Sequence, residues 1–243
     1  MKNDDPWWDM NLSRFPKGYT ACNMLRSERF PPLPQEVRDR LVERYCPPES
    51  TAMIKSNDAD RDCLVRIYLG RRKIQNQLRK GRNFFSLRNY PLPLNQAEDL
   101  NMQIKDYARA MAEALAMMQW TAKIDANDIE FVLGGTQKSG SGEHFNSFNN
   151  DFFGIHGLWI LDFDCCKPLT MDEAGVQQAT RAFQRNDPYF PYPSAPGSTA
   201  HILWQEFRSR YLECSQDRIG GERLKLPEQF LALVEDSHRQ AKT

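Results

Sequence analysis

The 243-residue chain contains no uninterrupted apolar run long enough to cross a bilayer, which takes about eighteen residues or more. Its first residues also lack the apolar stretch of a secretory signal peptide. The six cysteines and four histidines are dispersed, without a Cys-x-x-Cys pair or the spacing of a zinc finger. Neither a disulfide framework nor a structural metal is therefore indicated. We expect a cytoplasmic protein that does not enter a membrane and holds no metal.

Acidic residues are absent between Arg66 and Arg88, although the whole chain has 32 basic and 32 acidic residues. From Glu98 to Asp164 the balance reverses, with eleven acidic residues against four basic ones. A neutral chain with one basic and one acidic region predicts two chemically different partners. The members of the basic run are Arg66, Arg71, Arg72, Lys73, Arg79, Lys80, Arg82 and Arg88.

The basic run includes aromatic residues as well as cations, at Tyr68, Phe84 and Phe85. This mixture is typical of surfaces that contact phosphate backbones and unstacked bases. A run of charge can also be no more than a solvated face. No helix-turn-helix, zinc-finger or zipper pattern is present, which favours RNA over duplex DNA as the partner.

The spacing of apolar residues predicts a mainly helical α+β fold with short β-strands. We expect one domain over residues 1–243, in which residues 1–33 form an irregular N-terminal arm. Residues 134–154, rich in Gly, Ser and Asn, are expected to form a flexible loop. The predicted helices are residues 35–45, 95–120, 171–184, 199–214 and 226–238, and the main predicted strands are residues 63–69, 128–133 and 158–162.

Two of the predicted strands carry carboxylates at or near their ends. Asp125, Asp128 and Glu130 lie around the start of the first, and Asp162 and Asp164 follow the second. Burying an unpaired carboxylate costs several kcal/mol, so the pattern indicates a site for a metal, a cationic group or proton transfer. In the simpler interpretation, these aspartates are turn and capping residues.

The order of these segments is that of a kinase C-lobe. Asp125 would stand for the catalytic Asp, Glu130 for the metal-binding Asn five residues later, and Asp162 for the Asp of Asp-Phe-Gly. However, no His-Arg precedes Asp125, Asp164 replaces the glycine, and no glycine-rich phosphate loop lies upstream. The pattern does not predict an active ATP kinase. A degenerate kinase-like phosphotransferase or pseudokinase stays as an alternative.

The basic and acidic regions together suggest a ligand that carries both a polyanionic part and a cationic group. A basic surface would hold a polyanion while an acidic pocket receives a cationic group attached to it. The aminoacyl end of arginyl-tRNA combines these features, because its phosphates favour Lys and Arg and its guanidinium favours a bidentate carboxylate.

Seven segments of the chain carry a resemblance to a known family. They are ERFPPLP (28–34), YCP (45–47), CLVRIYLGRR (63–72), FSLRNYPL (85–92), IDANDIEFVLG (124–134), LWILDFD (158–164) and NDPY (186–189). Together they resemble the fungal arginine-containing cyclodipeptide synthases, over roughly residues 20 to 212. This family is not similar in sequence to the bacterial cyclodipeptide synthases, so the serine mechanism of those enzymes does not transfer.

The resemblance implies an enzyme that joins arginine from arginyl-tRNA to the residue of a second aminoacyl-tRNA, giving cyclo-Arg-Xaa. Because both esters are already activated, no ATP or other cofactor is expected. The basic run would contact tRNA, and neither DNA nor a membrane is an expected partner.

As an alternative, the chain is a non-catalytic RNA-binding module whose carboxylates brace a loop. The pocket residues are, for catalysis, Asp125, Glu130 and Asp162 and, for substrate binding, Asp128, Asp164 and Trp159.

Overall fold

The computed structural model describes residues 2, 5–24, 29–73, 85–136, 147–186 and 188–240. The chain divides into two compact units, Met1–Phe30 and Pro31–Thr243. The first unit contains helix α1 (Trp7–Asn11), a 3-10 turn, and a cluster of rings around the buried Trp8. The division lies close to the end of the predicted arm, which is less irregular than expected because of this helix.

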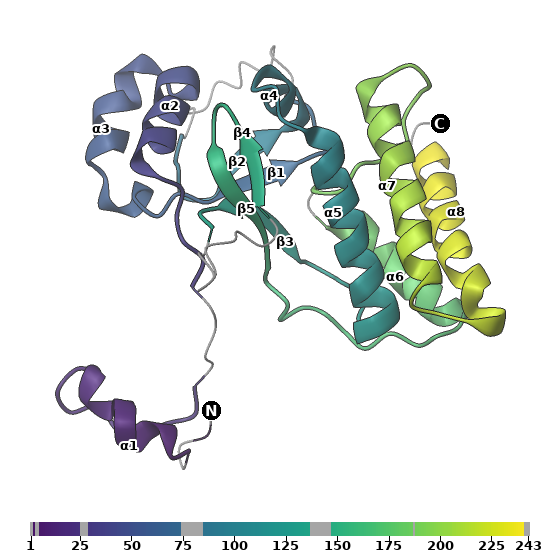
Figure 1. Cartoon of the computed structure of the whole chain (residues 1–243), viewed down its shortest axis with the longest axis horizontal. Helices are drawn as coiled ribbons and strands as arrows, with labels where there is room; N and C mark the ends of the chain where they lie inside the picture. Colours follow the sequence, from purple (N-terminus) through teal and green to yellow (C-terminus); the bar gives the residue numbers. More distant parts are fainter. Residues whose placement is uncertain are drawn as a thin grey trace. The chain divides into compact units, whose positions relative to one another are not determined.

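The larger unit is α+β and mainly helical, as predicted, with a sheet of five strands in the order β2-β1-β3-β5-β4 (Figure 1). β1 and β2 are parallel, and the other neighbours are antiparallel. The strands are β1 (Val65–Tyr68), β2 (Tyr90–Pro93), β3 (Glu130–Gly134), β4 (Ser147–Asn150) and β5 (Gly154–Leu161).

Seven helices of the larger unit surround this sheet among the described residues. They are α2 (Gln35–Tyr45), α3 (Thr51–Ser56), α4 (Leu94–Asp99), α5 (Ile104–Ala116), α6 (Glu173–Arg185), α7 (Thr199–Gln216) and α8 (Lys225–Gln240). Figure 1 shows α5 to α8 grouped on one side of the sheet, with α2 and α3 on the other. Fully buried rings such as Phe183, Phe207 and Phe230 join α6, α7 and α8. None of the described helices has the length and apolarity that a membrane span requires.

The long helix predicted over residues 95–120 is interrupted. α4 and α5 are separated by a turn in which Asn101 has a left-handed backbone, with φ of 50°. Asn150 of β4 donates its side-chain amide to the carbonyls of Leu100 and Asn101, at 3.0 and 3.3 Å. These bonds satisfy carbonyls that would otherwise continue the helix. Beyond α5 the chain widens into a π-helical turn, Met117–Ala122.

The flexible loop predicted over residues 134–154 includes a strand instead of being wholly irregular. β4 pairs with the first half of β5, and the tight turn between them is held by Asn150, whose side-chain oxygen accepts from the amides of Phe152 and Phe153. Gly154 begins β5 with φ of 65°, a backbone conformation that glycine adopts without strain. Residues 137–146 of the predicted loop lie outside the described part of the chain.

Candidate functional site

Two loops that carry the predicted carboxylates lie side by side. The 123–128 loop precedes β3 and the 162–168 loop follows β5; Glu130 of β3 is paired with Leu161 of β5, so both loops are at one end of this hairpin. Backbone bonds join them: the Asp125 amide donates to the Lys167 carbonyl at 3.0 Å, and the Leu169 amide donates to the Lys123 carbonyl at 2.8 Å. The sheet register therefore brings together residues that are about forty positions apart in the sequence.

These two loops contain four residues with left-handed backbones. Lys123, Ala126, Asp128 and Asp162 have φ values of 55°, 56°, 64° and 70°. For most residues other than glycine this conformation costs about 1–2 kcal/mol, whereas aspartate adopts it more readily, so the strain falls mainly on Lys123 and Ala126. Such strain persists only where the surrounding structure holds it, and it gathers at functional sites.

Asn186 holds part of this strained backbone from the end of α6. Its side-chain amide donates to the Ala126 carbonyl at 3.0 Å, and its side-chain oxygen accepts from the Asp128 amide at 2.6 Å. The Asn186 side chain is buried. The sequence analysis did not assign this role to Asn186. The feature that indicates it is an asparagine at a predicted helix end, where the side chain can bond to the backbone of a nearby loop.

Three exposed aspartates gather where the loops meet, and we call Asp128, Asp162 and Asp164 the acidic cluster. A side-chain hydrogen bond with Asp164 raises the pKa of Asp162 above its ordinary value, and partial desolvation and the negative charges of Asp164 and Asp128 add to the rise. The positive charge of Arg66 acts in the opposite direction. A carboxylate pair of this kind can accept and return a proton, and the cluster as a whole attracts cations.

Glu130 and Arg66, which were assigned to catalysis and to tRNA contact, form one ion pair beside the acidic cluster. Arg66 is opposite Val132 in the β1–β3 pair, so Glu130 is its diagonal cross-strand neighbour. The Arg66 Nη2 to Glu130 Oε1 distance is 2.5 Å, and only 14% of the Glu130 side chain is exposed. Each charge is therefore partnered within the protein.

Asp125 is not part of the acidic cluster. Its carboxylate is buried, with 4% of the residue exposed. Oδ1 accepts from the amides of Lys167 and Asn127 at 2.9 and 3.2 Å, and Oδ2 accepts from Gln178 Nε2 at 2.8 Å. This carboxylate ties the two loops to α6, which is the loop-bracing role that the RNA-binding alternative gives to the carboxylates.

Trp159, assigned to the substrate pocket, is paired with Val132 at the middle of the β3–β5 ladder, and its ring lies toward the end away from the two loops. Its indole N–H donates to the Gly135 carbonyl at 3.0 Å. The ring packs against Gly134 and Gly157, where an added Cβ would come within 3.3 and 2.9 Å of the indole. Trp159 therefore supports the hairpin and is not brought to the acidic cluster.

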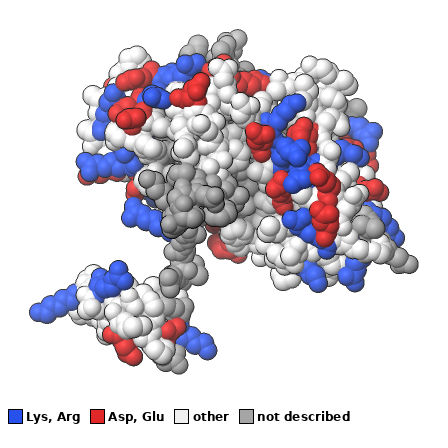
Figure 2. Space-filling view, viewed as in Figure 1, with Lys and Arg blue, Asp and Glu red and all other residues white. Residues whose placement is uncertain are grey.

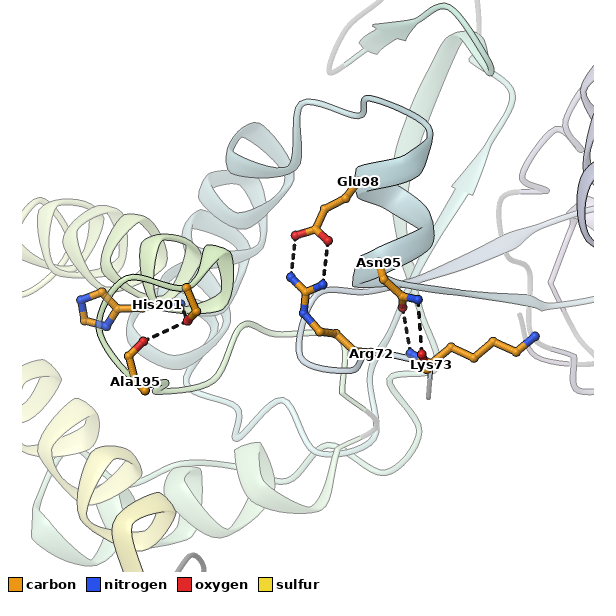
Figure 3. A network of polar contacts seen from close by, with 7 residues as sticks. Arg72, Lys73, Asn95, Glu98, Ala195 and His201 are labelled. Atoms are coloured by element: carbon orange, nitrogen blue, oxygen red, sulfur yellow. Dashed lines mark hydrogen bonds and ion pairs between the residues drawn. The ribbon is translucent and has the colours of Figure 1, made fainter. Parts of the chain in front are cut away.

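The basic run is only partly free to contact a phosphate. Figure 3 shows the Arg72 guanidinium donating two parallel hydrogen bonds to Glu98, at 2.7 and 2.5 Å, and the Lys73 backbone bonded to Asn95. The Lys73 side chain extends away from this network (Figure 3), and the Arg71 guanidinium lies 5.5 Å from the centre of the Tyr68 ring. The exposed members among the described residues include Arg71, Lys73 and Arg88, whereas Arg79, Lys80 and Arg82 lie outside the described residues.

Residues of the two loops and of α6 line a pocket of about 420 Å³, which we call the α6 pocket. Sequence reasoning missed it, although Gln178, Arg181 and Arg185 follow the three- and four-residue spacing that puts side chains on one face of a helix. The pocket is lined by Asp125, Asn127, Lys167, Pro168, Gln178, Arg181, Ala182 and Arg185.

Comparison with known proteins gives one partial match. Residues 158–223 are similar to the model of the DUF3669 family, which is described as zinc finger protein. The chain matches no curated protein and no solved structure. The matched stretch begins with the second half of β5 and includes the 162–168 loop, α6 and α7.

The matched residues do not fit a zinc finger. Within the described ranges, no three His, Cys, Asp or Glu side chains gather closely enough to hold a metal ion. The Cys166 thiol donates to the Asn127 carbonyl, and burial raises its pKa to about 11. Cys165 is exposed, and Cys214 is buried on α7. The similarity therefore concerns the second half of β5, the 162–168 loop, α6 and α7, and not the 123–128 loop.

Proposed function

We propose that the protein is an aminoacyl-tRNA-dependent enzyme that makes an arginine-containing cyclic dipeptide. The observation that supports this most is the acidic cluster, exposed on strained loops that are braced from behind by Asp125 and Asn186. An exposed group of carboxylates suits a substrate that carries a guanidinium and an ammonium group. The resemblance of seven sequence segments to the arginine-containing synthases points to the same substrate.

The reaction consists of two aminolysis steps. The α-amine of one aminoacyl ester attacks the ester carbonyl of the other, an amide C–N bond forms, and the C–O bond to the tRNA ribose breaks. The free amine of the dipeptidyl ester then attacks the remaining ester, which closes the ring and releases the second tRNA. Each amine enters as an ammonium group and loses two protons, one to solvent before it attacks and one as the amide forms, while each ribose oxygen leaves as a hydroxyl.

In this proposal the Asp162–Asp164 pair takes the proton that the attacking amine loses as the amide forms and returns it to the departing ribose oxygen. A raised pKa suits Asp162 to this exchange, because a stronger base accepts a proton more readily near neutral pH. Asp128 binds the arginine guanidinium. Asp125 and Asn186 are positioning residues, since their polar atoms are bonded to the loops.

A non-catalytic RNA-binding module is the second candidate, and the three donors on Asp125 favour it, because that carboxylate braces a loop. In such a module the acidic cluster would have no catalytic role. The kinase-like alternative has less support, since Glu130, at the position of the kinase metal ligand, is paired with Arg66.

The decisive test incubates purified protein with arginyl-tRNA and a pool of charged tRNAs, followed by mass spectrometry. The expected product is cyclo-Arg-Xaa, abolished by ribonuclease and by Asp162→Asn. Asparagine tolerates the left-handed backbone at this position, so the variant should fold. Asp217→Asn, at an exposed aspartate after α7, is the matched control and should retain activity. No product, together with magnesium-dependent ATP binding, would favour the kinase-like alternative.

A further inference from the structure

We propose that the α6 pocket binds a phosphodiester of the RNA strand next to the aminoacyl end of the tRNA. This inference rests on the proposed function and assigns a tRNA contact outside the basic run. Its first support is the lining, which includes the cations Lys167, Arg181 and Arg185 and the amide side chains of Asn127 and Gln178.

The cations of the pocket are available to a ligand. Many arginines of this protein are paired with carboxylates, as in Arg66–Glu130, Arg72–Glu98 and Arg109–Glu206. Over the described ranges, by contrast, Lys167, Arg181 and Arg185 form no ion pair. All three are exposed and can therefore reach an incoming anion.

The single carboxylate in the lining does not neutralise these cations. Asp125 faces three donors of the loops and α6, which leaves its oxygens engaged. Three cations and one carboxylate give the lining a formal charge of +2. A pocket with this charge and two guanidinium groups suits phosphate, which arginine binds through parallel hydrogen bonds.

The size and position of the pocket favour a phosphodiester over a free anion. A volume of about 420 Å³ is in the range of pockets that hold drug-sized ligands, so it can take a phosphate together with its ribose. Asn127 lines the pocket and is followed directly by Asp128 of the acidic cluster. Lys167 and Asp164 likewise share the 162–168 loop. A ligand held in both places must join a phosphate to a cationic group, as the 3′ end of an aminoacyl-tRNA does.

The test compares the double variant Arg181→Gln/Arg185→Gln with Lys55→Gln/Arg61→Gln, which removes the same charge from exposed residues in and after α3. Each is titrated with a fluorescent single-stranded RNA that ends in the tRNA acceptor sequence, at several salt concentrations. We expect at least tenfold weaker binding for the α6 variant and a salt dependence shallower by about 0.7 per lost phosphate contact. The control should match the wild type. Equal thermal unfolding midpoints would show that both variants fold.

The possible outcomes test the pocket assignment and the proposed reaction separately. If the α6 variant keeps wild-type RNA affinity and salt dependence, the pocket assignment is overturned even where cyclic dipeptide is made. If the variant loses RNA affinity but the wild type makes no product, the pocket stands and the proposed reaction fails. Inorganic phosphate is titrated in parallel by thermal shift. Stabilisation by phosphate that requires Arg181 and Arg185, without any RNA binding, would assign the pocket to a small phosphate ester and overturn the RNA proposal.

Discussion

Asp125 and Asp128 are three positions apart, yet their carboxylates have opposite surroundings. The Asp125 carboxylate is buried and accepts three hydrogen bonds, whereas Asp128 is exposed in the acidic cluster. Sequence spacing does not distinguish them, because two of the donors to Asp125 come from Lys167 and Gln178, 42 and 53 residues away. The carboxylate that aligns with a kinase catalytic Asp is thus the one that holds the loops.

This contrast predicts different stability effects of the same substitution. Asp125→Asn removes charge-assisted acceptors and should lower the free energy of unfolding by about 1.5–3 kcal/mol. Asp128→Asn should change it by less than about 0.5 kcal/mol, since its side chain is exposed and asparagine tolerates the left-handed backbone. Urea denaturation of both variants measures the difference. Equal effects would show that Asp125 does not brace the loops.

A second residue-scale prediction concerns the proton shared within the acidic cluster. Asp164→Asn removes a negative charge beside Asp162, so the pKa of Asp162 should fall toward its ordinary value. The acidic limb of the activity profile should then move to lower pH. NMR titration of the aspartate carboxyl carbons measures the pKa directly, with Asp217→Asn as the control. An unchanged Asp162 titration in the Asp164 variant would contradict the proposed pair.

At the scale of elements, α6 connects the two halves of the candidate site. Its first turn is capped by Asp172, whose side chain accepts from the Gly175 amide at 2.9 Å and from the Thr170 hydroxyl at 2.7 Å. Its middle supplies Gln178 to the Asp125 carboxylate, and Asn186, just after its end, bonds to the 123–128 loop. A shift of this helix would therefore disturb both loops and the α6 pocket together.

Gly175→Ala should produce such a shift. A Cβ at this position would lie 1.8 Å from the Thr170 carbonyl oxygen, so the helix or the preceding turn must move. Overpacking of this kind costs about 1–3 kcal/mol. Gly220→Ala is a matched control, because no atom lies within 4 Å of its added Cβ. Thermal unfolding should show a lower midpoint for the first variant and little change for the second; a tolerated Gly175→Ala would mean that this contact relaxes without cost.

The elements predicted from sequence are those whose signals are local. α2 has the predicted bounds because Pro34 precedes it and Pro47 and Pro48 follow it. The break between α4 and α5 depends on Asn150, some fifty residues distant, and β4 is a short strand of mostly polar residues that local pattern does not distinguish from a loop. Likewise, the position of the carboxylates near strand ends predicts a candidate site. The α6 pocket could not be predicted in this way, because its lining comes from two loops and a helix that are distant in the sequence.

For the molecule as a whole, charge is balanced locally as well as in total. Figure 2 shows Lys and Arg interspersed with Asp and Glu over the face formed by α5 and α7. Arg109–Glu206 and Arg210–Glu113 are ion pairs between these two helices. Surface ion pairs contribute little to stability. We infer that they act instead by neutralising arginines, which limits nonspecific association with polyanions. Unpaired cations, as in the α6 pocket, are therefore informative.

The stability of the whole molecule should decrease in mild acid because of one buried histidine. His156 is fully buried; its Nδ1 is 2.8 Å from the Gly154 carbonyl and must donate, so Nε2, 2.6 Å from the Tyr107 hydroxyl, accepts. Burial lowers the pKa of His156, so the folded protein holds the imidazole neutral to lower pH than the unfolded chain does. The unfolded chain takes up a proton near the ordinary pKa of about 6.5. Folding is therefore favoured fully above this pH and less as the pH falls from there toward the lowered pKa.

Urea denaturation between pH 7.5 and 5.5 measures this effect, and His156→Gln should reduce the slope of unfolding free energy against pH. His201→Gln, at a half-buried histidine on α7, should leave the slope as in the wild type. If both variants retain the wild-type slope, another group accounts for the acid sensitivity.

The antiparallel register of β3 and β5 has a consequence for sequence change over evolution. Five consecutive pairs, from Glu130 with Leu161 to Gly134 with Gly157, fix how the two strands align. The acidic cluster lies beyond one end of this ladder, and the chain that connects β3 to β4 leaves from the other. Insertions or deletions in that connection can therefore accumulate without changing how the carboxylates are arranged in space. Relatives of this protein should vary in length there while the distance along the chain from Asp125 to Glu130 stays constant.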